Sequence, residues 1–107
     1  MGSQGEVLLV TLPNGRRRPA VVVSSNWFNG SRDELVVAAV TSRRPAQPDR
    51  DDVPLLATEA GLPADATLKA GKLITIQQSQ VGKSLGKLPD KTLHVVLERV
   101  SEMLGLL

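Results

Sequence analysis

Residues 18–25, Arg-Pro-Ala-Val-Val-Val-Ser-Ser, place one cation at the entrance of an apolar stretch rich in β-branched side chains. Pro19 fixes its own φ angle and biases Arg18 toward an extended backbone, and the three valines suit a buried strand. A guanidinium stays charged near neutral pH and presents a planar fork of donors that fits phosphate oxygens. The segment therefore indicates a phosphate-binding arginine on a rigid strand. The alternative is a surface arginine that merely flanks a core strand.

The remaining arginines are unevenly distributed. The net charge is only +2, but Arg16 and Arg17 precede Arg18, and a second cluster is formed by Arg43 and Arg44. This layout favours a polyanionic partner such as nucleic acid. Three aspartates within residues 49–52 weaken the field of the second cluster, and a solubilising surface is the alternative explanation.

Composition excludes several kinds of chemistry. The 107 residues include no cysteine and one histidine, which rules out disulfides, thiolate zinc sites, cysteine nucleophiles and two-histidine metal motifs. The aromatic residues are Trp27 and Phe28, so base stacking on an aromatic platform is nearly unavailable. No apolar run reaches the ~18 residues of a transmembrane helix, and the N-terminus lacks a signal-peptide pattern. We expect one domain, residues 1–107, in a soluble cytoplasmic protein.

The elements that must position these side chains are mostly short strands. The pattern predicts strands at residues 6–12, 18–25, 34–42 and 53–56, and one or two more within residues 67–76, broken near Gly71. Asn14-Gly15 between the first two strands is a strong hairpin signal. Residues 26–33 read as a loop, residues 43–52 as a mobile loop and residues 59–63 as a turn region. Such a series indicates a mainly β (α+β) fold, either a curled sheet or a small barrel.

A helix is predicted after Pro89, with Asp90 as its cap. Its apolar positions recur at spacings of three and four residues, which predicts one face packed on the sheet. These positions are Leu93, Val96, Leu97, Val100, Met103 and Leu104. The single histidine, His94, lies beside this stripe and is expected at the surface. Gly82-Lys83-Ser84 is not a phosphate-binding P-loop, because Gln77 stands where that motif requires glycine.

Several segments follow one another in an order typical of a known family. They are Gly5-Glu6-Val7, residues 18–24 (RPAVVVS), residues 36–42 (VVAAVTS), Gly61-Leu62, Ile74-Thr75-Ile76 and Gly86-Lys87-Leu88. From about Gly5 to the last helix, the sequence resembles the MazF/PemK-like toxins of type II toxin–antitoxin systems. The resemblance implies an SH3-like β-barrel of five to seven strands with a C-terminal helix. It also implies a homodimer that acts as a sequence-selective endoribonuclease and is inhibited by an antitoxin protein.

The resemblance further implies that Arg18 and Thr41 form the catalytic pair, with neither a metal nor a cofactor. In RNA cleavage by the internal 2′-hydroxyl, Arg18 is suited to stabilising charge on the five-coordinate phosphate but not to base catalysis, because its pKa is too high. Thr41 can donate a hydrogen bond to a phosphate oxygen or position the attacking hydroxyl. The alternative for Thr41 is a strand-end residue bonded to its own backbone.

The chain departs from the family pattern in its first hairpin, which is short. Arg16 and Arg17 are expected to clamp phosphates, which positions a strand without reading its bases. Ile74 and Gln77 stand where many members have arginine and aspartate. We expect base recognition from the loops around Asn14, Ser42 and Gln77. Arg43 and Arg44 are expected to contact RNA or the antitoxin.

Two functions without catalysis remain as alternatives. The same barrel supports toxins that poison DNA gyrase through an aromatic-bearing C-terminal tail, whereas this chain ends Met-Leu-Gly-Leu-Leu. The other is a catalytically inactive protein that binds RNA or an antitoxin. The presence of Arg18 and Thr41 does not by itself separate these alternatives from the enzyme. Loss of toxicity in Arg18→Ala, with folding and dimerisation intact, would favour catalysis.

Overall fold

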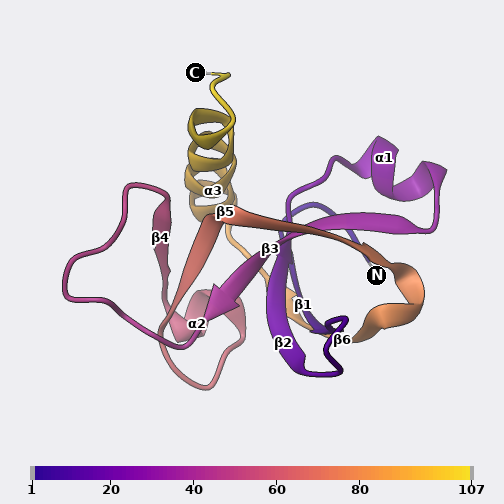
Figure 1. Ribbon diagram of the computed structural model, residues 1–107, viewed down its shortest axis with the longest axis horizontal. Coiled ribbons are helices and arrows are strands. Elements are labelled where there is room, and N and C mark those ends of the chain that lie inside the picture. Colours follow the sequence, from indigo (N-terminus) through magenta and orange to yellow (C-terminus); the bar gives the residue numbers. More distant parts are fainter. Residues whose placement is uncertain (1, 107) are drawn as a thin grey trace.

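The computed structural model describes residues 2–106 and shows six antiparallel strands in one strongly bent sheet, with a helix packed against it (Figure 1). In chain order the elements are β1 (Glu6–Thr11), β2 (Arg17–Val22), α1 (Asn26–Ser31), β3 (Glu34–Thr41), β4 (Asp52–Leu55), α2 (Ala57–Ala60), β5 (Ala66–Gln77), a 3₁₀ turn (Gln78–Gln80), β6 (Val81–Lys87) and α3 (Asp90–Met103). The spatial order of the strands is β4-β5-β3-β2-β1-β6. The mainly β class with six strands is therefore confirmed. Among the described residues the edge strands β4 and β6 do not pair, so the barrel-like sheet is curled but open.

The sheet is buried on both faces, which explains why its central strands are almost continuously apolar. Alternate residues of β2 and β3 enter two separate cores. The helix-side core contains Val21 and Ala38 together with Val96 and Val100 of α3. The second core lies on the other face of β2 and β3 and is built from Leu8, Val10, Ala20, Val22, Leu35, Val37 and Ile76. The β-branched run in β2 is thus shared between the two cores, and β2 is held rigidly.

The first hairpin forms as the sequence predicts. β1 and β2 pair antiparallel with Val10 opposite Arg18. At the turn the N–H of Leu12 donates to the carbonyl of Arg16, and the side-chain oxygen of Asn14 accepts the N–H of Arg16 at 2.9 Å. This hairpin places Arg18 at the second residue of β2, close to the turn.

The helix α1 and the strand β6 are among the elements that were not predicted. Residues 26–31 form the short helix α1 instead of a loop, and the hydroxyl oxygen of Ser25 accepts the N–H of Phe28 at its first turn. Residues 81–87 form the edge strand β6 although they are mostly polar or glycine. Pairing with β1 organises this strand, and a sequence pattern does not reveal such a partner.

The last helix follows its predicted position with two differences. Its apolar stripe buries Val96 and Val100 against the sheet, each worth about 1.5–3 kcal/mol when fully buried. Pro89, not Asp90, occupies the capping position, and Asp90 lies in the first turn. Met103 and Leu104, at the end of the predicted stripe, remain exposed. Within residues 2–106, no helix is long and apolar enough to cross a membrane.

The connection through α2 depends on one glycine. Gly61 ends α2 in the left-handed region at φ 66°. A Cβ at this position would lie 1.9 Å from the carbonyl oxygen of Leu85 in β6. Only glycine allows both this backbone conformation and this contact. The predicted turn region at residues 59–63 is therefore a helix end that rests on the edge strand.

β5 and the segment before β4 also differ from expectation. β5 is one continuous strand, although its pairing with β3 is irregular around Gly71, where the sequence predicted a break. Residues 43–52 were predicted to be a mobile loop. The final residues of this segment, 49–52, are instead held by hydrogen bonds to their own backbone, to β5 and to α3.

Candidate active site

Arg18 and Thr41 lie on neighbouring strands and line the same groove. Arg18 is near the start of β2, and Thr41 is the last residue of β3, which pairs antiparallel with β2. Each shares a strand face with an alanine of the groove wall, Ala20 and Ala39 respectively. The groove has a volume of about 300 Å³. The structure therefore brings together the two residues predicted to be catalytic.

The groove has an apolar base and a polar rim. Val10, Ala20 and Ile74 contribute apolar surface, whereas Arg18, Thr41 and Lys72 contribute polar groups. A second hollow of about 480 Å³ adjoins it and shares Thr41 and Lys72 with it. We refer to the two hollows together as the Arg18–Thr41 groove. Such a surface can hold an anionic chain whose phosphates meet the rim.

Three further residues line the second hollow, two of them cationic. They are Arg43, Pro45 and Lys69. Arg43 follows the end of β3, so its position depends on the same strand that positions Thr41. The combined groove thus collects cations from β2, from the segment after β3 and from β5. This distribution explains how a chain with a net charge of only +2 presents a basic surface.

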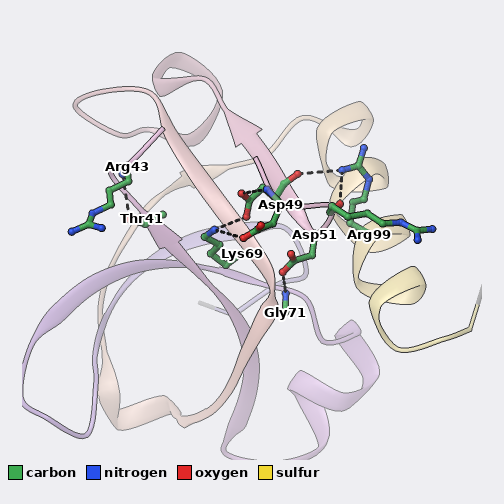
Figure 2. Close-up of polar contacts among 9 residues, drawn as sticks. Thr41, Arg43, Asp49, Asp51, Lys69, Gly71 and Arg99 are labelled. Atoms are coloured by element: carbon green, nitrogen blue, oxygen red, sulfur yellow. Dashed lines mark hydrogen bonds and ion pairs between the residues drawn. The ribbon is translucent and has the colours of Figure 1, made fainter. Parts of the chain in front are cut away.

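The hydroxyl of Thr41 is oriented by its own backbone. Its Oγ1 accepts the N–H of Arg43 at 3.3 Å, as Figure 2 shows. This is the backbone bond that the sequence offered as the alternative to catalysis. The two roles are compatible, because a hydroxyl that accepts one hydrogen bond still has its own proton to donate. Thr41 can therefore donate to an anion in the groove while this bond holds the oxygen in place.

Arg18 carries a charge that the described residues leave uncompensated. Its side chain is exposed and takes part in none of the ion pairs within residues 2–106. Guanidinium groups do not deprotonate near neutral pH, so this charge is permanent. The backbone of Arg18 belongs to β2, which lies between β1 and β3, and this limits the positions that the guanidinium can reach. Arg18 is thus a positioned cation available to an anionic ligand.

Lys69, which lines the second hollow, differs from Arg18 because its charge is already paired with carboxylates. Its ammonium lies 2.7 Å from Oδ1 of the buried Asp52 and 3.8 Å from Oδ2 of Asp49 (Figure 2). The hydrogen bond from Lys69 outweighs the effect of burial and lowers the pKa of Asp52. The same hydrogen bond raises the pKa of Lys69. Both members of this pair are charged at neutral pH. Lys69 is therefore occupied by carboxylates and is not available to bind phosphate.

The carboxylates of residues 49–52 are the only cluster of potential metal ligands in the part of the chain that the structure describes. They already have protein partners. Asp52 binds Lys69 and the N–H of Asp49, and Asp51 accepts the N–H of Gly71 at 2.9 Å. An ammonium group in this position opposes a cation. We therefore assign no metal to this cluster.

The other predicted substrate-binding residues lie outside the groove lining. Asn14 and Arg16 are at the exposed hairpin tip, and Ser42 is exposed next to Thr41. The guanidinium of Arg17 lies against Gly82 of β6, on the side of β2 opposite Arg18. Arg44 forms an ion pair with Asp65 at 3.2 Å.

Gln77 lies beside the end of β3 that is opposite Thr41. It pairs with Glu34 at the start of β3, whereas Thr41 is at the end of that strand. The two ends are separated by roughly 23 Å of extended chain. The amide nitrogen of Gln77 also donates to the Glu34 carboxylate at 3.3 Å. Within one chain, the structure does not bring Gln77 to the catalytic pair.

Sequence reasoning missed Lys72, which lines both hollows. Lysines within a predicted strand carry no motif, so the sequence offered only one signal, the expected break near Gly71. That signal concerned the backbone, and its consequence for the neighbouring side chain appears only once β3 and β5 are paired.

Known proteins resemble this chain in sequence and in fold. Residues 3–104 match the family described as PemK-like, MazF-like toxins of type II toxin–antitoxin systems. Two curated relatives are 30% identical over 92 residues, which cover 85% of this chain and 81% of each relative. They are endoribonuclease MazF2 of Mycobacterium bovis and endoribonuclease MazF6 of Mycobacterium tuberculosis.

Solved structures share the fold at lower identity. A mycobacterial endoribonuclease in complex with its cognate antitoxin superposes with a TM-score of 0.86 at 21% identity, covering 100% of this chain and 98% of that one. The MazF of a MazE–MazF complex from Deinococcus radiodurans gives a TM-score of 0.79 at 24% identity, with 98% and 96% covered. The family match spans almost all the described residues, and it includes both strands that carry Arg18 and Thr41. The chain therefore belongs to the PemK-like, MazF-like toxins of type II toxin–antitoxin systems.

Proposed function

We propose that this toxin is a metal-independent endoribonuclease that cleaves single-stranded RNA at the Arg18–Thr41 groove. The observation that carries the proposal is the meeting of an uncompensated arginine and an oriented hydroxyl on one groove wall. The relatives named endoribonucleases support the same activity. We further propose that the whole chain, residues 1–107, acts as one domain in the cytoplasm.

In the proposed reaction the 2′-oxygen of a ribose attacks the adjacent phosphorus while the bond from phosphorus to the 5′-oxygen breaks. The proton lost from the 2′-hydroxyl is balanced by a proton gained at the departing 5′-oxygen. Arg18 stabilises the negative charge that accumulates on the phosphate oxygens in the transition state. Thr41 donates its hydroxyl proton in a hydrogen bond to a non-bridging phosphate oxygen. The products are a 2′,3′-cyclic phosphate and a 5′-hydroxyl.

The partners we propose are a second copy of this chain and a cognate antitoxin protein. The mycobacterial structure described as a complex with its cognate antitoxin, and the MazE–MazF complex of Deinococcus radiodurans, support the second. An antitoxin segment with acidic or apolar side chains would suit the basic rim and apolar base of the groove. RNA and antitoxin would then compete for the same surface. Arg16, Arg17, Ser42, Arg44, Asn14 and Gln77 remain predicted RNA contacts outside the groove.

The test is incubation of a long single-stranded RNA with the purified protein in EDTA, followed by determination of the fragment ends. We expect discrete cuts with cyclic phosphate and 5′-hydroxyl ends. A matched RNA with a deoxyribose on the 5′ side of the cut should bind but remain intact, because it lacks the nucleophile. Intact RNA across varied sequences, with folded protein, would favour a non-catalytic RNA-binding or gyrase-binding toxin. Cleavage only after addition of a divalent metal ion would refute the proposed mechanism.

A further inference from the structure

The pairing of β5 with β3 contains an irregularity beside the candidate active site. Ala38 of β3 pairs with Leu73, but its neighbour Ala39 pairs with Lys69. Ala70, Gly71 and Lys72 therefore lie between two consecutive pairs and form a bulge. Bulges change the direction of side chains and are common near active sites. Here the bulge places Lys72 on the lining of both hollows of the Arg18–Thr41 groove.

Asp51 holds the backbone of this bulge. Its carbonyl accepts the N–H of Ala70 at 3.1 Å. Its Oδ2 accepts the N–H of Gly71 at 2.9 Å, a bond that Figure 2 shows. A Cβ at residue 71 would lie 2.6 Å from this carboxylate oxygen, so glycine is needed for the approach. Arg99 of α3 in turn donates to the carbonyls of Arg50 and Asp52, on either side of Asp51. The bulge is thus fixed to the segment before β4 and, through it, to α3.

Residues 49–52 also engage Lys69, the other lysine of β5 that lines the groove. Asp52 and Asp49 pair with Lys69, whereas Lys72 takes part in none of the ion pairs found within residues 2–106. The exposed Lys72 therefore keeps its charge available on the lining that it shares with Arg18, Thr41 and Arg43. A compact ammonium group with three donors binds phosphate oxygens well as a point charge.

We propose that Lys72 binds a phosphate of the RNA substrate in the Arg18–Thr41 groove, and that Asp51 is a positioning residue that holds the bulge carrying Lys72. This inference rests on the proposed function. It adds a third cation to the groove, contributed by β5 instead of β2 or the segment after β3.

The experiment measures binding and cleavage of a single-stranded RNA that the wild type cuts, at several salt concentrations. Binding uses the analogue with a deoxyribose at the cut. Lys72→Gln should weaken binding about 10- to 100-fold, as expected for a lost hydrogen bond to a charged group. The slope of log affinity against log salt should become shallower by about 0.7, the value for one phosphate contact on a single strand. Lys72→Arg should restore most of the affinity. Lys91→Gln, an equal charge change on exposed α3, serves as the control.

The role of Asp51 is tested by double substitution. Asp51→Ala should weaken binding, but should add little once Lys72 is already glutamine, because both changes act through one contact. Asp51→Asn keeps an acceptor oxygen for the N–H of Gly71 and should rescue binding. Thermal unfolding of each variant separates this effect from loss of the fold.

The outcomes distinguish the two levels of the argument. A wild type that cuts RNA, with Lys72→Gln matching Lys91→Gln in affinity and in salt slope, would overturn the role of Lys72 alone. Additive effects of Asp51→Ala and Lys72→Gln would overturn the positioning role. A folded wild type that neither binds nor cuts RNA would overturn the proposed function and this inference with it.

Discussion

Lys69 and Lys72 are separated by only two residues on β5, yet their surroundings differ completely. Lys69 is paired with the buried Asp52 and with Asp49, whereas Lys72 has no ion-pair partner among the described residues and faces the groove. The first lysine stabilises the fold, and the second is available to a ligand. The comparison teaches that the number of cations near a site says little about the charge a substrate meets. The charge that a substrate meets depends on which of these cations are already paired with carboxylates of the protein.

The same difference separates two larger regions. The segment of residues 49–52 is tied to β5 and α3 by ion pairs and backbone hydrogen bonds, so its polar groups serve structure. In the Arg18–Thr41 groove, by contrast, Arg18 and Lys72 form no ion pair within residues 2–106, and only Thr41, through its backbone bond, and Lys69, through its ion pairs, are engaged. Substitutions in the groove should therefore change activity and leave stability intact. Substitutions in the segment should do the reverse, apart from Asp51, which contacts the groove through the bulge.

The largest effect on activity is expected from Arg18→Ala. Removal of a positioned donor from a developing oxyanion typically costs about 10²–10³-fold in rate, and we expect a loss in this range. Single-turnover cleavage of RNA measures it. The melting temperature should match that of the wild type, because the side chain is exposed and forms no ion pair within residues 2–106. If the variant cut RNA at a rate comparable to that of the wild type, Arg18 would not be a catalytic residue, and the groove would not differ from the segment of residues 49–52 in the way described.

Thr41→Val should produce the second largest effect. The substitution keeps the shape of the side chain but removes both the donor to phosphate and the acceptor for the N–H of Arg43. We expect a rate loss of about 10- to 100-fold, the typical contribution of one hydrogen bond to a charged group. Thr41→Ser retains the hydroxyl and is the matched control. If valine and serine gave equal rates, Thr41 would be only a strand-end residue.

The segment is tested through Asp52→Asn and the dependence of stability on pH. The pKa of Asp52 is lowered by Lys69 from an ordinary value of 3.8, so its contribution is present above about that pH and is lost as the pH falls through the lower folded value. The pKa of Lys69 is raised from 10.5, so its contribution is present below that pH and is lost as the pH rises through the higher folded value.

At pH 7 the Asp52→Asn variant should therefore melt below the wild type, and the difference should shrink under strongly acidic conditions. Thermal unfolding followed by circular dichroism between pH 2 and pH 9 measures this. Cleavage by the folded variant at low temperature should change little. A difference in melting temperature that is constant across the acid range would show that the carboxylate charge is not what stabilises the pair.

The smallest effects separate the two neighbouring arginines after β3. Arg43 lines the groove, whereas Arg44 is engaged with Asp65 in an exposed ion pair. Arg43→Gln should weaken RNA binding several-fold, and Arg44→Gln should weaken it less. Loss of the exposed pair should cost at most about 1 kcal/mol of stability. Equal losses of affinity, measured side by side at the same salt concentration, would place Arg44 in the RNA-binding surface as well.

Much of the fold followed from local signals. Asn14-Gly15 between apolar runs predicted the first hairpin, and the spacing of Val96 and Val100 predicted the packed face of α3. β6 escaped prediction because its polar residues become a strand only by pairing with β1, far away in sequence. α1 escaped because asparagine and glycine disfavour helices and the cap at Ser25 is a weak signal.

The site divides in the same way. Arg18 was identifiable because Pro19 and the valines after it determine local backbone geometry, and Thr41 through the family pattern. Lys72 was not identifiable, because its role depends on a bulge and on a carboxylate at residue 51. Gln77 was named for its place in the pattern, and pairing with Glu34 puts it at the other end of β3.

The strand order has a consequence for how the protein is made. β1 lies between β2 and β6, so the earliest of the six strands in chain order pairs on one side with the latest. The groove likewise takes Arg18 from β2 and Lys72 from β5. A growing chain thus contains Arg18 long before Lys72, on the opposite wall of the groove, has been synthesised. Because contacts between distant segments form late, the ribosome that synthesises this toxin releases most of the chain before a complete groove can assemble beside the messenger RNA.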